Sequence, residues 1–264
     1  MSTESTDAAS TSTQNTQYDK IGTKYKLMHE LPAIQPERPS VLAALSDIKG
    51  TRCLDLACGT GRYSHLMLTI GAASVTGYDI SSFMIDGARA SYPSSEYPNL
   101  TFEVADCSKP LPASNPYDII FAGWFLNYAG TQSELVSMFR NISSNLSPSG
   151  RFVGITTNVH DKLMHTPKID FYGLDVLVLD EAYKEPGEEE VLGIKARVVA
   201  HTEQPIQFDV FQFRKEVYER CAREAGLVLS WRDVVVPDDE RKGSGYWERW
   251  LDRPTFVIVE ARNV

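Results

Sequence analysis

The sequence at residues 53–64, CLDLACGTGRYS, consists of an apolar run with an acid inside it, two closely spaced glycines and the start of a stretch with helical spacing. This order predicts a buried strand that turns sharply into a helix. Gly59 and Gly61 lack a Cβ atom, so a ligand can approach the turn closely. A turn that binds a dinucleotide has a third glycine, where this chain has Ser64, and it holds a diphosphate, which Asp55 would repel. The turn is therefore predicted to hold a ligand with cationic groups and no phosphate.

Strand and helix patterns alternate from this turn to residue 157. The expected strands cover 51–57, 74–80, 100–105, 117–123 and 151–156, and the expected helices cover 61–70, 81–91 and 131–146. This alternation predicts a parallel sheet with crossover helices on its faces. In such sheets, ligands bind beyond the carboxyl ends of the strands.

The segments on either side of this alternation differ from it in composition. Residues 1–17 contain nine Ser or Thr and almost no apolar residues, so we expect a flexible tail before one domain over 18–264. Residues 158–212 carry an acidic run and two strand-like stretches, GIKARVVA and IQFDVFQF, which predict an insertion that forms an edge hairpin or a lid. A helix over 213–226 and two adjacent antiparallel edge strands, LVLSWRDVVV and TFVIVEA, follow. The expected fold is α/β and Rossmann-like, with a seven-stranded, mostly parallel sheet, an antiparallel edge and a lid insertion.

Charge and composition limit the class of partner. The 264 residues carry 35 acidic and 26 basic side chains, for a net charge of −9, whereas nucleic acids and anionic membrane surfaces select clustered Lys and Arg. No stretch approaches the ~20 apolar residues of a membrane helix, and the N-terminus has no apolar signal core. We therefore expect a cytoplasmic monomer or homodimer that binds a small molecule. The four cysteines have no CxxC pair and no metal-ligand spacing, and they are expected to be reduced thiols.

Five stretches occur in the order and spacing of a known family. LDLACGTGRYS (54–64), VTGYDIS (75–81), FEVADCS (102–108), YDIIFAGWFLNYA (117–129) and LSPSGRFVGIT (146–156) resemble successive motifs of class I S-adenosylmethionine-dependent methyltransferases. The short stretches YDxIG, ACGTGRYS, ADCS and LNYA are most similar to those of the small-molecule members that act in specialised metabolism.

The resemblance implies S-adenosylmethionine as the cofactor and S-adenosylhomocysteine as its product. In the family pattern, the acid at the position of Asp79 accepts hydrogen bonds from both ribose hydroxyls, and the acid at Asp106 binds the adenine amino group beside the backbone N–H of Cys107. The cofactor-binding residues implied within these motifs are Asp55, Ala57, Gly59, Gly61, Asp79, Ile80, Met84, Asp106, Cys107 and Gly123. Structural interpretations stay open: the acids can cap a helix or form turns, and Ile80 and Met84 can be core residues.

Helical spacing precedes the first strand. Residues 18–31 predict one helix and residues 38–48 a second, shorter one. The resemblance implies that the first helix closes over the cofactor, with Tyr18 and Tyr25 at the methionine part. The alternative is that both rings pack against the domain.

The loop after the fourth strand, GWFLNY, is where the acceptor of this family approaches the sulfonium. It lacks the Asn-Pro-Pro-Tyr type turn of DNA and many protein-amide methyltransferases, and its aromatic residues indicate an aromatic-lined pocket. The residues predicted to bind the acceptor are Trp124, Tyr128, Tyr172, His201, Phe211 and Trp247. Core packing is the alternative for the tryptophans, and an exposed loop position is the alternative for His201.

Methyl transfer mainly needs an aligned nucleophile and the exclusion of water, and it needs a base only where the acceptor must lose a proton. His160, just past the fifth strand, is predicted as that base, and Asn127 is predicted to orient the acceptor. An exposed loop position is the alternative for His160. None of the five histidines has metal-ligand spacing from another, so no metal is expected.

The sequence thus predicts transfer of a methyl group to an O or N atom of a small molecule, a specialised metabolite. Two other classes stay open. One is a member of the fold that binds the cofactor but catalyses a cyclisation or acts as a non-catalytic partner. The other is a methyltransferase of protein or RNA, of which the acidic charge disfavours RNA.

Overall fold

The computed structural model describes residues 27–111 and 115–264. The predicted tail and the predicted cofactor contacts Tyr18 and Tyr25 lie outside these residues, as does most of the first expected helix. A short 3-10 helix, η2 (Pro32–Ile34), precedes the first described α-helix, α2 (Glu37–Ala44).

A seven-stranded sheet forms the centre of the structure, in the order β10-β11-β5-β4-β1-β2-β3. Its strands are β1 (Arg52–Leu56), β2 (Ser74–Asp79), β3 (Leu100–Val104), β4 (Tyr117–Gly123), β5 (Leu146–Thr157), β10 (Leu227–Arg232) and β11 (Phe256–Asn263). β11 runs antiparallel to both of its neighbours, and the other strands run parallel to one another. The predicted fold class is confirmed.

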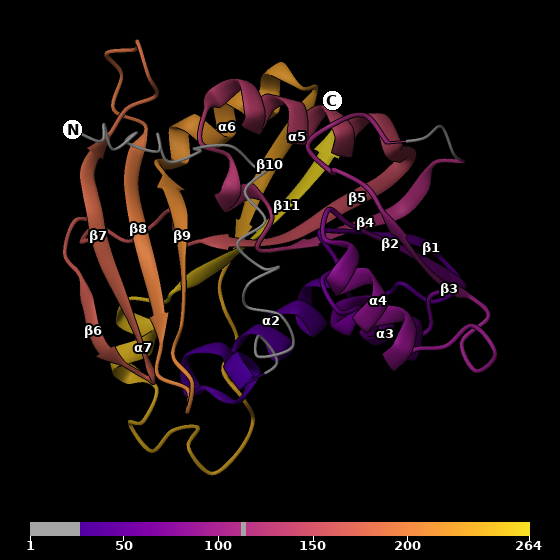
Figure 1. Ribbon diagram of the computed structural model, residues 1–264, viewed down its shortest axis with the longest axis horizontal. Coiled ribbons are helices and arrows are strands. Elements are labelled where there is room, and N and C mark those ends of the chain that lie inside the picture. The colour runs from indigo at the N-terminus through magenta and orange to yellow at the C-terminus, as the bar shows by residue number, and fades with distance from the viewer. Residues whose placement is uncertain (1–26, 112–114) are drawn as a thin grey trace, which may run out of the picture.

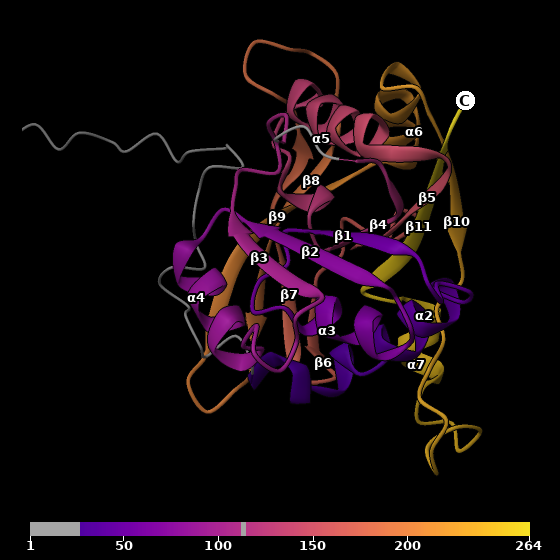
Figure 2. The same cartoon turned by 90° about the vertical axis from the view of Figure 1, so that its right-hand side faces the viewer.

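Helices cover both faces of this sheet (Figure 2). On one face lie α2, α3 (Arg62–Thr69) and α4 (Ser82–Ser91), and on the other lie α5 (Gln132–Asn145) and α6 (Lys215–Glu224). Successive strand residues point to opposite faces. Cys53 and Ile119 therefore pack with the first group of helices, whereas Leu54 and Ile120 pack with the second. The apolar runs predicted for the central strands follow from this burial on both sides.

A second sheet stands to one side of the first (Figure 1). It contains four antiparallel strands, β6 (Lys168–Phe171), β7 (Leu174–Tyr183), β8 (Gly193–Ala200) and β9 (Ile206–Phe213). We name this sheet the lid sheet. β8 and β9 coincide with the two predicted strand-like stretches. The lid sheet is joined to the end of β5, where the Gln212 amide donates to the Asn158 carbonyl (2.8 Å).

The insertion is larger than the predicted edge hairpin. Two of its four strands, β6 and β7, were not predicted. β6 has four residues, which is too few for a clear alternation. The apolar run in β7 has residues that are half-buried on both faces, so polar and apolar side chains do not alternate along it. A short helix, α7 (Glu248–Asp252), lies in the loop before β11, and it was also not predicted.

Two further expectations concern the thiols and the membrane. All four cysteines are buried free thiols. Within the part of the chain that the structure describes, no helix combines the length and the apolar character needed to cross a bilayer.

Candidate functional site

The turn between β1 and α3 has the left-handed backbone that its glycines allow. Gly59 has a φ of 54° and Gly61 a φ of 80°, in the left-handed region that favours glycine. A Cβ atom at Gly61 would lie 2.5 Å from the Phe102 ring, whereas one at Gly59 would meet no atom within 4 Å. Gly61 is thus needed for packing, and Gly59 leaves open space in front of the turn.

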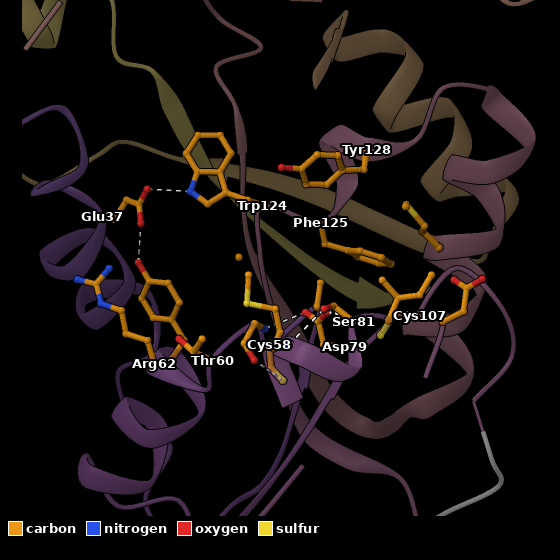
Figure 3. A pocket seen from close by; sticks show the side chains of 18 of the residues that line it. Glu37, Cys58, Thr60, Arg62, Asp79, Ser81, Cys107, Trp124, Phe125 and Tyr128 are labelled. Atoms are coloured by element: carbon orange, nitrogen blue, oxygen red, sulfur yellow. Dashed lines mark hydrogen bonds between the residues drawn. The ribbon is translucent and has the colours of Figure 1, made fainter. Parts of the chain in front are cut away.

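This open space belongs to a cavity of about 1100 Å³ at the carboxyl ends of β1, β2, β3 and β4. We name it the first cavity. The predicted cofactor residues that line it are Ala57, Gly59, Asp79, Ile80, Met84, Asp106, Cys107 and Gly123. Figure 3 shows Glu37 and Arg62 at one end and Cys107 at the other, with Asp79 between them.

Asp79 lies at the end of β2, and its carboxylate is fixed by the backbone. The Gly59 N–H donates to Oδ2 (2.8 Å) and the Ser81 N–H donates to Oδ1 (2.9 Å). Each carboxylate oxygen can accept a further bond. The side chain still lines the first cavity, so it can receive donors from a ligand there.

Asp55 lies behind the turn and does not line the first cavity. The Ser64 hydroxyl donates to its Oδ2 (2.5 Å), and Ser64 belongs to the first turn of α3. Burial raises the pKa of Asp55 to about 7, against the lowering effect of the Ser64 bond, and the charge of Asp79 adds to the rise. The alternative interpretation of Asp55 as a cap of the next helix therefore fits the geometry, whereas direct contact with a ligand does not.

Asp106 and Cys107 follow β3. Ser108 donates to Asp106 Oδ1 through its N–H (3.0 Å) and its hydroxyl (2.6 Å), and Lys109 lies 3.0 Å from Oδ2. Burial opposes ionisation, but these bonds keep the pKa of Asp106 below its usual value. Asp106 thus stabilises a turn, as one of the predicted alternatives has it, and it also lines the first cavity.

A polar cluster at the other end of the first cavity was not predicted. The buried Glu37 accepts one hydrogen bond from the Trp124 indole (2.7 Å) and one from the Tyr63 hydroxyl (2.8 Å). Burial raises the pKa of Glu37, although the Arg62 guanidinium acts against this rise. Arg62 itself lies 2.7 Å from His29 Nδ1. Burial, followed by the charge of Arg62, lowers the pKa of His29 to about 4, so this imidazole is neutral at pH 7.

A second cavity, of about 770 Å³, lies between the lid sheet and the ends of β4 and β5. We name it the second cavity. It shares His29, Glu37, Trp124 and Tyr128 with the first. Its apolar lining residues are Met28, Ile34, Leu174, Val176, Ala196, Val198, Phe208 and Val210, and its other polar ones are Thr157, Lys168, Gln212 and Thr255.

Two of the six predicted acceptor-binding residues, Trp124 and Tyr128, line both cavities. Trp124 has a φ of 60°, which residues other than glycine rarely adopt, and its indole is held by Glu37. The other four are Tyr172, His201, Phe211 and Trp247, and they line neither cavity.

The reasons for these four positions differ. Tyr172 and the buried Trp247 stack on each other at 5.7 Å, beneath the central sheet, which is the packing alternative. His201 is 40% exposed and pairs with Asp175 (3.1 Å). Phe211 packs with Tyr183 and lies on the face of β9 opposite to the cavity, because side chains alternate along a strand.

The two predicted catalytic residues also lie outside both cavities. His160 is exposed, as expected for a loop residue. Its ring centroid lies 6.0 Å from that of Trp231, in an edge-to-face arrangement. Asn127 is fully buried in η3 (Leu126–Tyr128), and neither polar atom of its side chain has a hydrogen-bond partner among the described residues.

Residues 47–189 match the family model described as "Methyltransferase domain". Among curated proteins, the chain is 26% identical over 148 residues to a ubiquinone biosynthesis O-methyltransferase of Neisseria meningitidis, covering 55% of this chain and 58% of that protein. It is 24% identical over 146 residues to a demethylmenaquinone methyltransferase of Lactococcus lactis, covering 53% of this chain and 57% of that protein. The chain thus spans less than two thirds of the curated relatives that it matches.

Solved structures match over more of the chain. An S-adenosylmethionine-dependent methyltransferase from Mesorhizobium loti has a TM-score of 0.61 at 23% identity, covering 86% of this chain and 98% of that one. The CcbJ methyltransferase from Streptomyces caelestis has a TM-score of 0.64 at 18% identity, covering 95% and 99%. At these identities the likeness establishes the fold.

Proposed function

Because this chain belongs to the methyltransferase domain family, we propose that it uses S-adenosylmethionine to methylate an oxygen or nitrogen atom of a small molecule. The observation that carries the proposal is a pair of adjacent cavities with common lining residues, one at the family's strand-end motifs and one beneath the lid sheet. A cofactor and an acceptor would meet where the cavities share residues.

The residues of the first cavity fit this cofactor. Asp79 presents a carboxylate to ribose hydroxyls, and Ile80 and Met84 offer apolar surface to the adenine ring. Arg62 supplies a cation for the methionine carboxylate, at the start of a helix and beside the open space in front of Gly59. When bound, S-adenosylmethionine supplies a methyl group on a sulfonium, which a nucleophile can attack.

The second cavity supports a small-molecule acceptor. Its walls are aliphatic side chains of the lid sheet together with the aromatic rings of Trp124, Tyr128 and Phe208. Ligand sites of this kind are mostly apolar with a few placed polar groups. The curated relatives named for ubiquinone biosynthesis and for demethylmenaquinone also support a small-molecule acceptor.

Catalysis by this chain consists mainly of alignment and exclusion of water. Where the acceptor must lose a proton, Glu37 is the proposed base in place of His160. It is buried at the shared wall of the two cavities, and burial raises its pKa, which makes its carboxylate a stronger base. Trp124 and Tyr63 hold it in place.

Incubation with methyl-labelled S-adenosylmethionine and a panel of phenols, amines and hydroxy acids tests the proposal. Label in a small-molecule product supports it. An altered product without label indicates the cyclase alternative, and label in macromolecules of a lysate, with none in small molecules, indicates the protein or RNA alternative. Either result contradicts the proposal.

A further inference from the structure

A buried charge cluster, which the proposed function does not use, borders the second cavity through Lys168. Lys168 Nζ lies 2.5 Å from Asp161 Oδ2, and Arg253 binds both oxygens of the same carboxylate, through Nε (3.2 Å) and Nη2 (3.1 Å). The side chains of Lys168, Asp161 and Arg253 are 7%, 1% and 20% exposed. Two cations therefore share one carboxylate, and the cluster carries one excess positive charge.

An excess charge in such a place is unfavourable unless a partner compensates it. Burial lowers the pKa of Lys168, although Asp161 opposes this change. Within residues 27–111 and 115–264, Asp161 is the one acidic side chain within 4 Å of Lys168. The ammonium has three N–H donors, of which Asp161 takes one. The cluster is thus suited to receive an anion.

Lys168 lines the second cavity and not the first. Three polar side chains, those of Thr157, Gln212 and Thr255, line the same cavity. The buried hydroxyl of Thr255 has no hydrogen-bond partner within the described residues. A buried polar atom without a partner is unfavourable, so this hydroxyl is a second, independent indication of a polar ligand in a cavity that is mostly apolar.

The other titratable groups of this cavity permit an anion. His29 is neutral at pH 7 because its pKa is about 4, so it neither attracts nor repels the anion strongly. Glu37, which has a raised pKa, lies at the wall shared with the first cavity. Asp161 already accepts bonds from Lys168 and Arg253.

We propose that the acceptor is an apolar molecule with an acidic group, and that this group binds Lys168 and the Thr255 hydroxyl in the second cavity. This inference rests on the proposed function. The acidic group is distinct from the methylated atom, because Lys168 does not reach the first cavity, where the methyl donor binds. The acceptor therefore carries two polar groups on one apolar body, one at the shared wall and one at Lys168.

The test uses three pairs of probes, namely hydroxybenzoic, hydroxycinnamic and hydroxynaphthoic acid, each with its uncharged methyl ester. Calorimetry measures their binding to the full-length chain saturated with S-adenosylhomocysteine. We expect at least one acid to bind about 10-fold or more tightly than its ester, as charge-assisted hydrogen bonds predict. Lys168→Met removes this preference and leaves Asp161 paired with Arg253. Lys195→Met is the matched control, because Lys195 lies on the same sheet but lines neither cavity.

Three results overturn the inference: equal affinity for acid and ester in all three pairs, a preference that survives Lys168→Met, or no binding of any acid. Thr255→Val checks the assignment without altering charge, and we expect it to weaken the acid and not the ester. Affinity for S-adenosylhomocysteine alone separates the two proposals. A chain that binds this molecule but shows no acid preference refutes the present inference only, whereas a chain that does not bind it refutes the proposed function.

Discussion

The two cavities share a wall but are built in different ways. The first is lined by the turns that end four parallel strands, so backbone geometry fixes its polar groups, as the two amides on Asp79 show. The second is lined by side chains on one face of the lid sheet, where the backbone places few demands on residue type. A cofactor site of the first kind has a recognisable sequence, whereas an acceptor site of the second kind can change its specificity by side-chain replacement alone.

A substitution at the wall between the two cavities is expected to have the largest effect on turnover. Glu37→Gln keeps the size of the side chain and partners for Trp124 and Tyr63, but removes a base. We expect turnover on an acceptor that must lose a proton to fall by about 100-fold or more, with affinity for S-adenosylhomocysteine unchanged within about threefold. Single-turnover rates across pH together with calorimetry measure both quantities. A loss of affinity with normal turnover would instead assign Glu37 to the ammonium group of the cofactor.

The carboxylate of Asp55, behind the first cavity, is expected to make the stability of the fold depend on pH. The pKa of Asp55 is about 7 in the folded chain and 3.8 as the ordinary value, so the folded state binds the proton more tightly. Its contribution to stability is complete below pH 4 and is lost as pH rises through 7. This change amounts to at most about 4 kcal/mol. Urea unfolding at pH 5 and pH 8 should therefore show a smaller loss of stability with rising pH in Asp55→Asn than in the parent chain. An identical pH dependence in both would show that Asp55 is ionised in the fold.

The carboxylate inside the first cavity, that of Asp79, is expected to control cofactor binding. Asp79→Ala should weaken S-adenosylhomocysteine by about 30-fold or more, because bonds to charged groups are worth about 1.5–3 kcal/mol each. Asp86→Ala is the control, since Asp86 is 77% exposed on α4. Calorimetry decides the matter, and equal affinities in the two variants would move the cofactor away from the end of β2.

Acceptor binding in the second cavity should depend on the volume of the side chains that line it. Val198→Phe places a ring in the cavity and should raise KM for the acceptor by about 10-fold, the effect of a few methylene groups in an apolar pocket. Val199→Phe on the opposite face of β8 should leave it unchanged. Steady-state kinetics compares the two. If Val199→Phe has the larger effect, the acceptor binds on the other face of the lid sheet.

The sequence predicted eight of the residues that line the first cavity, because they follow strands with clear patterns. Asp79, Asp106 and Gly59 lie at strand ends that the alternation of elements places side by side. Asp55 shows the limit of that reasoning, because the same motif serves a residue that caps α3 from behind the turn. Glu37 could not be predicted, since tertiary packing alone brings α2 to the end of β4.

The second cavity could not be predicted for a different reason. A shift of one residue in the register of a strand turns every side chain to the other face. Phe211 was predicted to line the cavity, whereas its neighbour Val210, on the other face of the strand, does so. His160 lies near the expected end of β5, but its side chain is exposed. Lys168 gave no signal, because a single Lys in a strand of four residues is not a motif.

The most direct test of this account is calorimetry of the full-length chain with S-adenosylhomocysteine and, separately, with NAD. We predict saturable binding of S-adenosylhomocysteine at a ratio of one per chain and no binding of NAD, because the turn has Ser64 in place of the third glycine of a dinucleotide-binding turn. Binding of NAD without binding of S-adenosylhomocysteine would contradict the account.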